Sequence, residues 1–267
     1  MLRHTFLHVP GVGAKREREL WRRGFPDWDA FRAHHPPGAW RDLIVGHLEG
    51  DAAARALPRR EAWRLAPEYP GRTLFLDIET TGLSFSSDAI TCIGVSDGTS
   101  TRAFVRGEDL DLFPTALEGV GLLVTYNGSS FDLPMLQGAF PGVDFRGFRH
   151  IDLRFPLRRL GTRGGLKGAE RMLGVDRSEA ILGVDGFIAV LLWQAHREGV
   201  RSALPTLIRY CLEDVVNLKP LLTLVYNRMS GELPVPIAPM GDEGRPTIPY
   251  VADGDLLRHL RLRRAWA

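Results

Sequence analysis

A short apolar run followed at once by two acids constrains this chain more than any other feature of its sequence. The run Leu74-Phe75-Leu76 predicts a buried strand, and Asp77 and Glu79 follow it two residues apart. Because side chains alternate across a strand, both carboxylates point to the same face. Carboxylates on one face of a buried strand repel each other unless a cation lies between them. The segment therefore predicts either a cation site or a strand end with two solvated acids.

The pattern around this strand predicts an α/β layered domain. Further strands are expected at residues 90–95, 101–105, 122–124 and 148–153, with a hairpin turn at Asp97-Gly98. Helical spacing of apolar residues begins at Gly165, and a long helix is expected over residues 204–225. We divide the chain into a helical appendage at 1–70, the α/β domain at 71–230, and a proline-rich strap with a basic C-terminal helix at 231–267.

Composition argues against a membrane or secreted protein. Hydrophobic residues make up 44% and charged residues 25% of the 267 positions, the usual mix for a globular protein with a sizeable core. The longest apolar run, 187–193, has seven residues, whereas a membrane helix needs about 20. The N-terminus lacks the apolar stretch of a signal peptide, and two cysteines make no disulfide framework. We therefore expect a cytoplasmic protein.

Two later segments add acids in the same α/β setting. The turn Asn127-Gly128-Ser129-Ser130 follows an expected strand and leads through Phe131 to Asp132, which falls in the first turn of a helix. A negative charge at that position also favours the helix by itself. Tyr210 and Asp214 lie four residues apart, and therefore on one face of the expected long helix. Each of these patterns is common when it occurs alone.

Together the three segments resemble the DnaQ-like superfamily of 3'-5' exonucleases, which have a ribonuclease H-like fold. The resemblance covers residues 73–225, and the four acids of the family fall on Asp77, Glu79, Asp132 and Asp214. Tyr210 stands where the tyrosine subclass of these DEDD enzymes has its tyrosine. Three further segments are similar to the narrower YprB-type group of ribonuclease H-like proteins: His150-Ile151-Asp152-Leu153, Gly165-Leu166-Lys167 with Glu170, and Leu173-Gly174-Val175.

The resemblance implies a two-metal site for phosphodiester hydrolysis. Two Mg²⁺ or Mn²⁺ ions about 3.5–4 Å apart are expected, because hard divalent ions prefer carboxylate oxygens. By similarity, Asp77 would bridge both ions, Glu79 and Asp214 would hold the water-activating one, and Asp132 would hold the second through water. Tyr210 would orient the attacking water. Nucleic-acid contacts are expected from residues in or beside the same motifs: Thr80, Asn127, Phe131 and Lys167.

A second motif lies in the N-terminal appendage. Val9-Pro10-Gly11-Val12-Gly13-Ala14-Lys15 precedes an amphipathic run and resembles the loop of a helix-hairpin-helix. In such a loop, glycines permit close backbone approach, and the N-terminus of the following helix attracts a phosphate. Gly11, Gly13 and Lys15 are therefore candidate nucleic-acid-binding residues, and a plain helical turn is the alternative.

The basic residues between 146 and 167 allow two interpretations. They could track a phosphate backbone, or they could form solvated helix faces, and the net charge of the chain is only +2. Lys167 is expected to meet a phosphate with Glu170 as its surface partner, and His150 is expected to be a packed or hydrogen-bonded residue. Asp152 is expected to be structural or to support a nearby strand. The residues concerned are Arg146, Arg149, Arg154, Arg158, Arg159, Arg163 and Lys167.

These observations favour a metal-dependent 3'-5' exonuclease that acts on single-stranded DNA or RNA. Two alternatives remain open. One is a non-catalytic nucleic-acid-binding module on the same fold, and the other is a structure-specific endonuclease. The four acids and Tyr210 argue against the binding module, since a site without catalytic function has no need for acids that repel one another.

Overall fold

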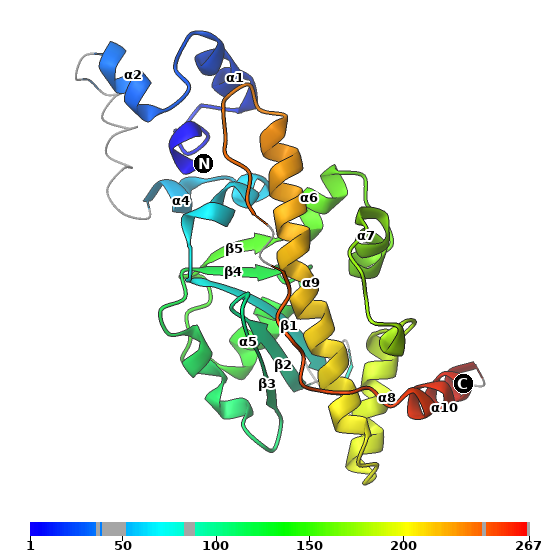
Figure 1. Ribbon diagram of the computed structural model, residues 1–267. Coiled ribbons are helices and arrows are strands. Elements are labelled where there is room, and N and C mark those ends of the chain that lie inside the picture. The colour runs from blue at the N-terminus through cyan, green and yellow to red at the C-terminus, as the bar shows by residue number, and fades with distance from the viewer. Residues whose placement is uncertain (36–37, 39–51, 83–88, 242–243, 266–267) are drawn as a thin grey trace. The chain divides into compact units, whose positions relative to one another are not determined.

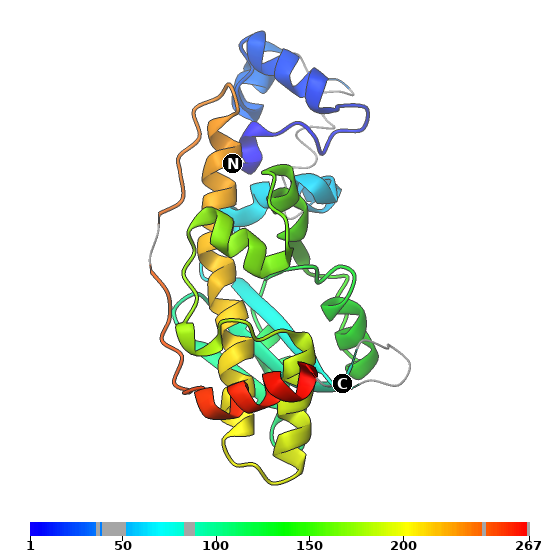
Figure 2. The same ribbon diagram turned by 90° about the vertical axis from the view of Figure 1, so that its right-hand side faces the viewer.

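The computed structural model describes residues 1–35, 38, 52–82, 89–241 and 244–265. The chain forms two compact units, and helix α9 (Ala203–Gly231) contributes residues to both. Unit 1 consists of Met1–Pro70 and Leu222–Asp242, and unit 2 consists of Gly71–Leu221 and Glu243–Ala267. Figures 1 and 2 show the elements of the units in two views.

Unit 2 is built on one mixed five-stranded sheet with the strand order β3-β2-β1-β4-β5. Strand β1 lies at its centre, antiparallel to β2 and parallel to β4. The expected hairpin joins β2 to β3, and β5 is parallel to β4. This sheet, with helices on its faces, confirms the predicted ribonuclease H-like α/β class. The strands are β1 (Thr73–Thr80), β2 (Ile90–Ser96), β3 (Thr101–Val105), β4 (Leu122–Thr125) and β5 (Arg149–Asp152).

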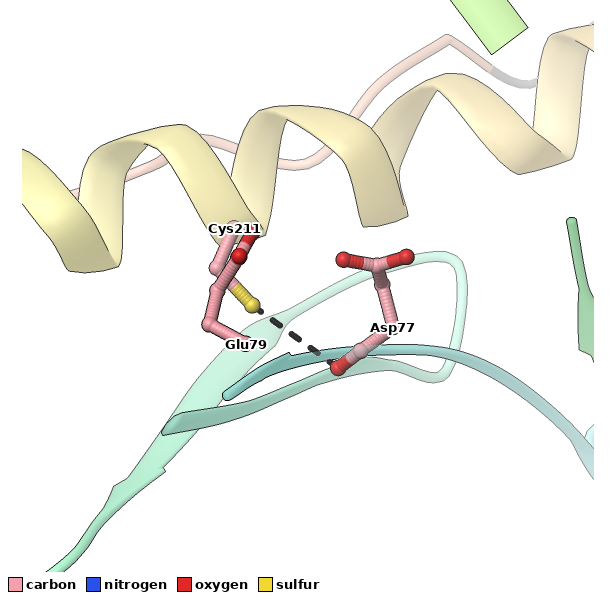
Figure 3. A group of neighbouring side chains, drawn as sticks. All are labelled: Asp77, Glu79 and Cys211. Carbon is pink, nitrogen blue, oxygen red and sulfur yellow. Dashed lines mark hydrogen bonds between the residues drawn. The ribbon is translucent and has the colours of Figure 1, made fainter. Parts of the chain in front are cut away.

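The two faces of the sheet pack against different helices. On one face, Leu74, Leu76 and Ile78 of β1 join a buried core with residues of η3 (Leu110–Leu117) and α5 (Asp132–Ala139). On the other face, residues of β2 and β3 pack against α9, α8 (Gly186–Arg197) and α10 (Gly254–Ala265). The alternation along β1 leaves Asp77 and Glu79 on the side of α9 (Figure 3).

Helix α9 is longer than the pattern over 204–225 predicts. Tyr226 and Met229 are buried beyond that range, so packing continues and the helix extends to Gly231. No helix that the structure describes is long and apolar enough to cross a membrane. The described residues between 232 and 253 have neither helix nor strand. The other helices of unit 2 are α6 (Arg154–Arg159), α7 (Gly165–Leu173) and η4 (Glu179–Ile181).

Unit 1 is helical, as predicted for the N-terminal appendage, and it is organised around a buried ion pair. The carboxylate of Glu17 accepts two hydrogen bonds from Arg64, each 3.0 Å long. It also accepts from the hydroxyl of Thr5 and the backbone N–H of Phe6, so its charge is fully compensated. The elements are η1 (Leu2–His4), α1 (Ala14–Arg22), α2 (Trp28–His34), α4 (Ala52–Ala56) and η2 (Arg59–Glu68).

Candidate metal centre

A close approach of α9 to the sheet brings its side chains to the acids of β1. Asp77 pairs in register with Gly94 of β2. A Cβ atom at Gly94 would lie 2.8 Å from Sγ of Cys211 and 3.1 Å from a methyl group of Val215, so only glycine permits this contact. As a result, Sγ of Cys211 lies over the strands and donates a hydrogen bond of 3.7 Å to the carbonyl oxygen of Asp77 (Figure 3).

The turn that leads to Asp132 is held from the neighbouring strand. The carboxylate of Asp152, at the end of β5, accepts hydrogen bonds from the backbone N–H groups of Asn127 at 2.7 Å and Ser129 at 3.1 Å. Asn127 has a positive φ of 66°, and a Cβ at Gly128 would lie 2.1 Å from Oγ1 of Thr125. This tight turn therefore depends on Asp152, which has the supporting role expected from the sequence.

Asp132 begins α5 and reaches back to β1. Its residue is only 3% exposed, and its carboxylate accepts a hydrogen bond from the backbone N–H of Ile78, between the two acids of β1. The pKa of Asp132 is raised to about 7, chiefly by burial and also by the charges of Asp152 and Asp214. The third predicted acid therefore joins the β1 pair.

Asp214, on α9, pairs with an arginine that the sequence did not single out. The guanidinium of Arg177 contacts the carboxylate of Asp214, and its side chain is 5% exposed. Arg177 also donates two hydrogen bonds to Glu170, from Nε at 2.8 Å and from Nη2 at 2.6 Å. Asn217 donates to the same carboxylate at 2.8 Å. Asp214 is thus held by a buried network that α7 and α9 share.

The network corrects the expectation that Glu170 is a surface partner of Lys167. Glu170 is buried, as are the preceding residues Gly168 and Ala169 of α7, and its carboxylate accepts from Arg177 and Asn217. Lys167 instead donates a 2.9 Å hydrogen bond to Oη of Tyr210 and a second one to the carbonyl oxygen of Val184. Lys167 is half-buried, and both of these hydrogen bonds direct its ammonium toward Tyr210 and Val184 rather than toward Glu170.

Tyr210 lies among the acids with its hydroxyl engaged. The residue is 4% exposed, and its pKa is raised well above the usual value by burial and by the charges of Asp214, Glu79 and Asp77. The hydroxyl therefore stays protonated at neutral pH. Because Lys167 donates to the oxygen, the hydroxyl proton is available for a carboxylate or a water molecule.

The acids raise one another's pKa values, as closely placed carboxylates must. Burial is the largest cause for Asp77, followed by the charges of Asp132, Asp214 and Glu79. Burial also raises the pKa values of Glu79 and Asp214 above their usual range, although Arg177 and Lys167 oppose the shift at Asp214. Such a group of charges is unfavourable without a cation, and its oxygen donors suit Mg²⁺ or Mn²⁺. The residues present therefore fit the expected metals.

The other residues expected near nucleic acid are engaged within unit 2. Thr80 is buried, and its hydroxyl donates to the carbonyl oxygen of Gly82. The side-chain oxygen of Asn127 accepts from Arg154, and Phe131 packs half-buried against the core beside α5. His150 is hydrogen-bonded, as expected, to Oγ1 of Thr125 at 2.9 Å.

The predicted basic stretch is only partly at the surface. Arg149 is buried and donates to the carbonyl oxygen of Gly147, while Arg154 contacts Asn127. Those two side chains help to fold the loops between β4 and α6. The exposed members are Arg146, Arg158, Arg159 and Arg163.

The N-terminal candidates Gly11, Gly13 and Lys15 belong to unit 1 and are all exposed. Gly11 has a φ of +79°, which favours glycine, and Gly13 is the residue before α1. The residue before the helix is a glycine, so no side chain at that position caps the first N–H groups of α1. The element before the loop, η1, is a three-residue 3-10 helix rather than a full helix.

Sequence reasoning did not single out Arg177 or Cys211 as site residues. Arg177 follows α7 in a loop, and no local pattern pairs it with an acid 37 positions later. Cys211 falls at an apolar position of the long helix, where a buried cysteine is common. The sequence holds one indication of its role, because Cys211 is adjacent to Tyr210 and lies on the turn of α9 that carries the site residues.

A comparison with protein families agrees with this fold. A family described as the RNase_H superfamily matches residues 74–226. No curated protein is significantly similar in sequence. Among solved structures, the family B DNA polymerase from the hyperthermophilic archaeon Pyrobaculum calidifontis is 21% identical, with a TM-score of 0.46, and the match covers 60% of this chain and 26% of the polymerase. A structure described as the apo form of a nuclease is 24% identical, with a TM-score of 0.42, and the match covers 62% and 78% of the two chains.

The raised pKa of Asp132 predicts how stability changes with pH in the absence of metal. Unfolded Asp has a pKa of about 3.9, whereas folded Asp132 has a pKa of about 7. Between these values the folded state binds more protons, so the group makes folding less favourable as pH rises. We expect Asp132→Asn to flatten the fall in unfolding free energy between about pH 4 and 7, measured by urea denaturation in EDTA. The exposed Asp111→Asn is the control, and equal slopes for all three proteins would contradict the prediction.

Proposed function

The chain belongs to the RNase H superfamily, and on that premise we propose that it is a metal-dependent nuclease, specifically a 3'-5' exonuclease of single-stranded nucleic acid. The single observation that carries the proposal is the convergence of Asp77, Glu79, Asp132 and Asp214. These acids come from β1, α5 and α9, which are distant in sequence, and the charges of Asp132 and Asp214 act on both Asp77 and Glu79.

The proposed mechanism assigns a role to each side chain. Asp77, Glu79, Asp132 and Asp214 would hold two divalent ions, which supply positive charge to activate water and to stabilise the leaving 3'-oxygen. The hydroxyl of Tyr210 would donate a hydrogen bond that orients the attacking water. Lys167 fixes that hydroxyl by donating to its oxygen, and Arg177 holds the carboxylate of Asp214. The hydrolysed strand would be DNA or RNA.

Nucleic-acid binding outside the acid cluster is proposed for two surfaces. The first is the exposed arginine group Arg146, Arg158, Arg159 and Arg163 of unit 2. The second is the loop of unit 1 that carries Gly11, Gly13 and Lys15. Backbone N–H groups at an uncapped helix start, together with a lysine, suit a phosphate oxygen.

The two alternative functions predict different products from the same substrates. A 3'-5' exonuclease shortens a 5'-labelled linear strand one nucleotide at a time and leaves a circular single strand intact. An endonuclease cuts the circle, and a binding module does neither. Matched DNA and RNA oligomers with Mn²⁺ would therefore test activity, polarity and sugar preference in one experiment.

The acid cluster predicts that divalent metal stabilises the protein. Binding to the folded state at about 100 times the Kd contributes about 2.7 kcal/mol. Asp77→Asn removes one repelling charge, so in EDTA the variant should melt at a higher temperature than the wild type. Mn²⁺ should stabilise the variant much less than it stabilises the wild type, and nuclease activity should be lost. Thermal melting with EDTA and with millimolar Mn²⁺ measures both effects. Equal melting of the wild type under the two conditions would contradict a metal centre.

Tyr210→Phe should slow the chemical step without unfolding the protein. A positioning hydrogen bond contributes about 10²–10⁴ in rate, or roughly 3–5 kcal/mol. The ring and its packing remain in the variant, so the melting temperature and Mn²⁺ affinity should change little. Single-turnover cleavage measures the effect, and Tyr226→Phe, another buried tyrosine of α9, is the matched control. A Tyr210→Phe protein with wild-type turnover would end the catalytic assignment of this hydroxyl.

Gly13→Val should weaken nucleic-acid binding if the N-terminal loop contacts phosphate. Gly13 has an extended backbone, and a Cβ there meets no atom within 4 Å, so the new side chain blocks the loop without disturbing the fold. Affinity for a single-stranded oligomer should fall, while the single-turnover rate at saturation stays the same. Lys15→Ala should reduce the slope of log affinity against log salt concentration by about the amount that one phosphate contact contributes. Gly186→Val is the control, because a Cβ at that helix start also meets no atom within 4 Å. Unchanged affinity of Gly13→Val would exclude the loop as a nucleic-acid-binding site.

A further inference from the structure

Cys211 lies beside the acids of β1 but has no part in the mechanism proposed above. Its Sγ atom and one carboxylate oxygen from each of Asp77 and Glu79 all lie within 4.8 Å of one another. Figure 3 shows the sulfur directed from α9 toward the strands, between the two acidic residues. Together these atoms supply two oxygen donors and one sulfur donor to a common space.

Glu79 provides independent evidence that this space takes a cation. The residue is 7% exposed, and its carboxylate accepts no hydrogen bond from any residue that the structure describes. A buried carboxylate without a partner is costly, and native proteins compensate for it almost without exception. The nearby charges of Asp214 and Asp132 are also negative, and only Lys167 opposes them among the charges that act on Glu79. The ammonium of Lys167 donates its hydrogen bonds to Tyr210 and Val184, so a bound cation is the partner that would satisfy the carboxylate of Glu79.

We propose that Asp77, Glu79 and Cys211 form a site for a thiophilic divalent ion of the Zn²⁺, Co²⁺ or Cd²⁺ class, held by two carboxylates and a thiolate. The donor set differs from the all-oxygen set that Mg²⁺ and Mn²⁺ would use in the same region. Mixed sulfur and oxygen ligands select these softer ions.

The geometry requires only small movements. Zinc binds sulfur at about 2.3 Å and carboxylate oxygen at about 2.0–2.2 Å, so tetrahedral ligand atoms lie roughly 3.3–3.6 Å apart. The three donors are within 4.8 Å of one another, and rotations that move them by about 1 Å bring them to those separations. The fourth position would remain for water. Gly94 leaves room for the sulfur, because a Cβ there would lie 2.8 Å from it.

The thiol separates soft ions from hard ones. A hard ion such as Mg²⁺ binds through the carboxylate oxygens alone, whereas a soft ion displaces the thiol proton and gains a strong metal–sulfur bond. Since both ions need Asp77 and Glu79, a bound Zn²⁺ would exclude the hard ions and inhibit hydrolysis; this last consequence rests on the proposed function, whereas binding does not.

Cobalt spectroscopy tests the site without any nuclease assay. Titration of the full-length, metal-free protein with Co²⁺ should give a saturable thiolate-to-cobalt charge-transfer band in the near ultraviolet, which added Zn²⁺ removes. Cys211→Ala should abolish the band and weaken Co²⁺ binding by roughly tenfold or more, with Mg²⁺ affinity nearly unchanged. Cys92→Ala is the matched control, since Cys92 is also a fully buried cysteine, and it should keep the band.

Each of two results would overturn the proposal. One is a wild-type protein that binds Co²⁺ without a charge-transfer band, which shows that sulfur is not a ligand. The other is a band that persists in folded Cys211→Ala. Circular dichroism and melting establish that each variant is folded. Glu79→Gln provides a second arm that leaves the thiol intact, and it should weaken Co²⁺ binding too. A protein without nuclease activity that still gives the band would refute the proposed function and leave this site standing.

Discussion

The close contact between α9 and the sheet at Gly94 is the constraint on which the metal centre depends. A side chain at that position would meet Cys211, Val215 and Leu212 within 3.3 Å and push the helix away from β2. The turn of α9 from Tyr210 to Asp214 would then move away from the acids of β1. The contact is held by fully buried apolar side chains on the same face of the sheet, and their hydrophobic free energy offsets the cost of holding carboxylates together.

That electrostatic cost is compensated unevenly among the four acids. Asp214 has Arg177, and Asp132 has the backbone N–H of Ile78. The charge of Lys167 opposes the rise in pKa at both Asp77 and Glu79. Glu79 accepts no hydrogen bond from the described residues. The protein therefore supplies part of the positive charge and leaves the remainder for cations. An arrangement of this kind is expected where metal binding, rather than stability alone, determines which residues are placed together.

The sequence predicts most of the fold because strands, turns and helices leave local patterns. The acids were expected for a different reason, the resemblance of three segments to the exonuclease superfamily, because each local spacing allows a structural explanation when it occurs alone. The contacts of Lys167, Glu170 and Arg177 were beyond such reasoning. Lys167 and Glu170 are three residues apart and look like a surface pair, but which face of α7 is turned inward depends on its packing against α9. Only the structure shows which face of α7 is buried.

The arrangement of Arg177 explains how the site can hold a buried arginine and still accept metal. An arginine paired only with Asp214 would lose its partner when that carboxylate turned to a cation, and it would be left as a buried unpaired charge. Here Glu170 accepts from both Nε and Nη2 of Arg177, and Asn217 holds Glu170 in turn. The guanidinium therefore keeps a bidentate partner whichever way Asp214 turns. Asp214 can exchange its arginine contact for a cation, while the rest of the buried network stays in place.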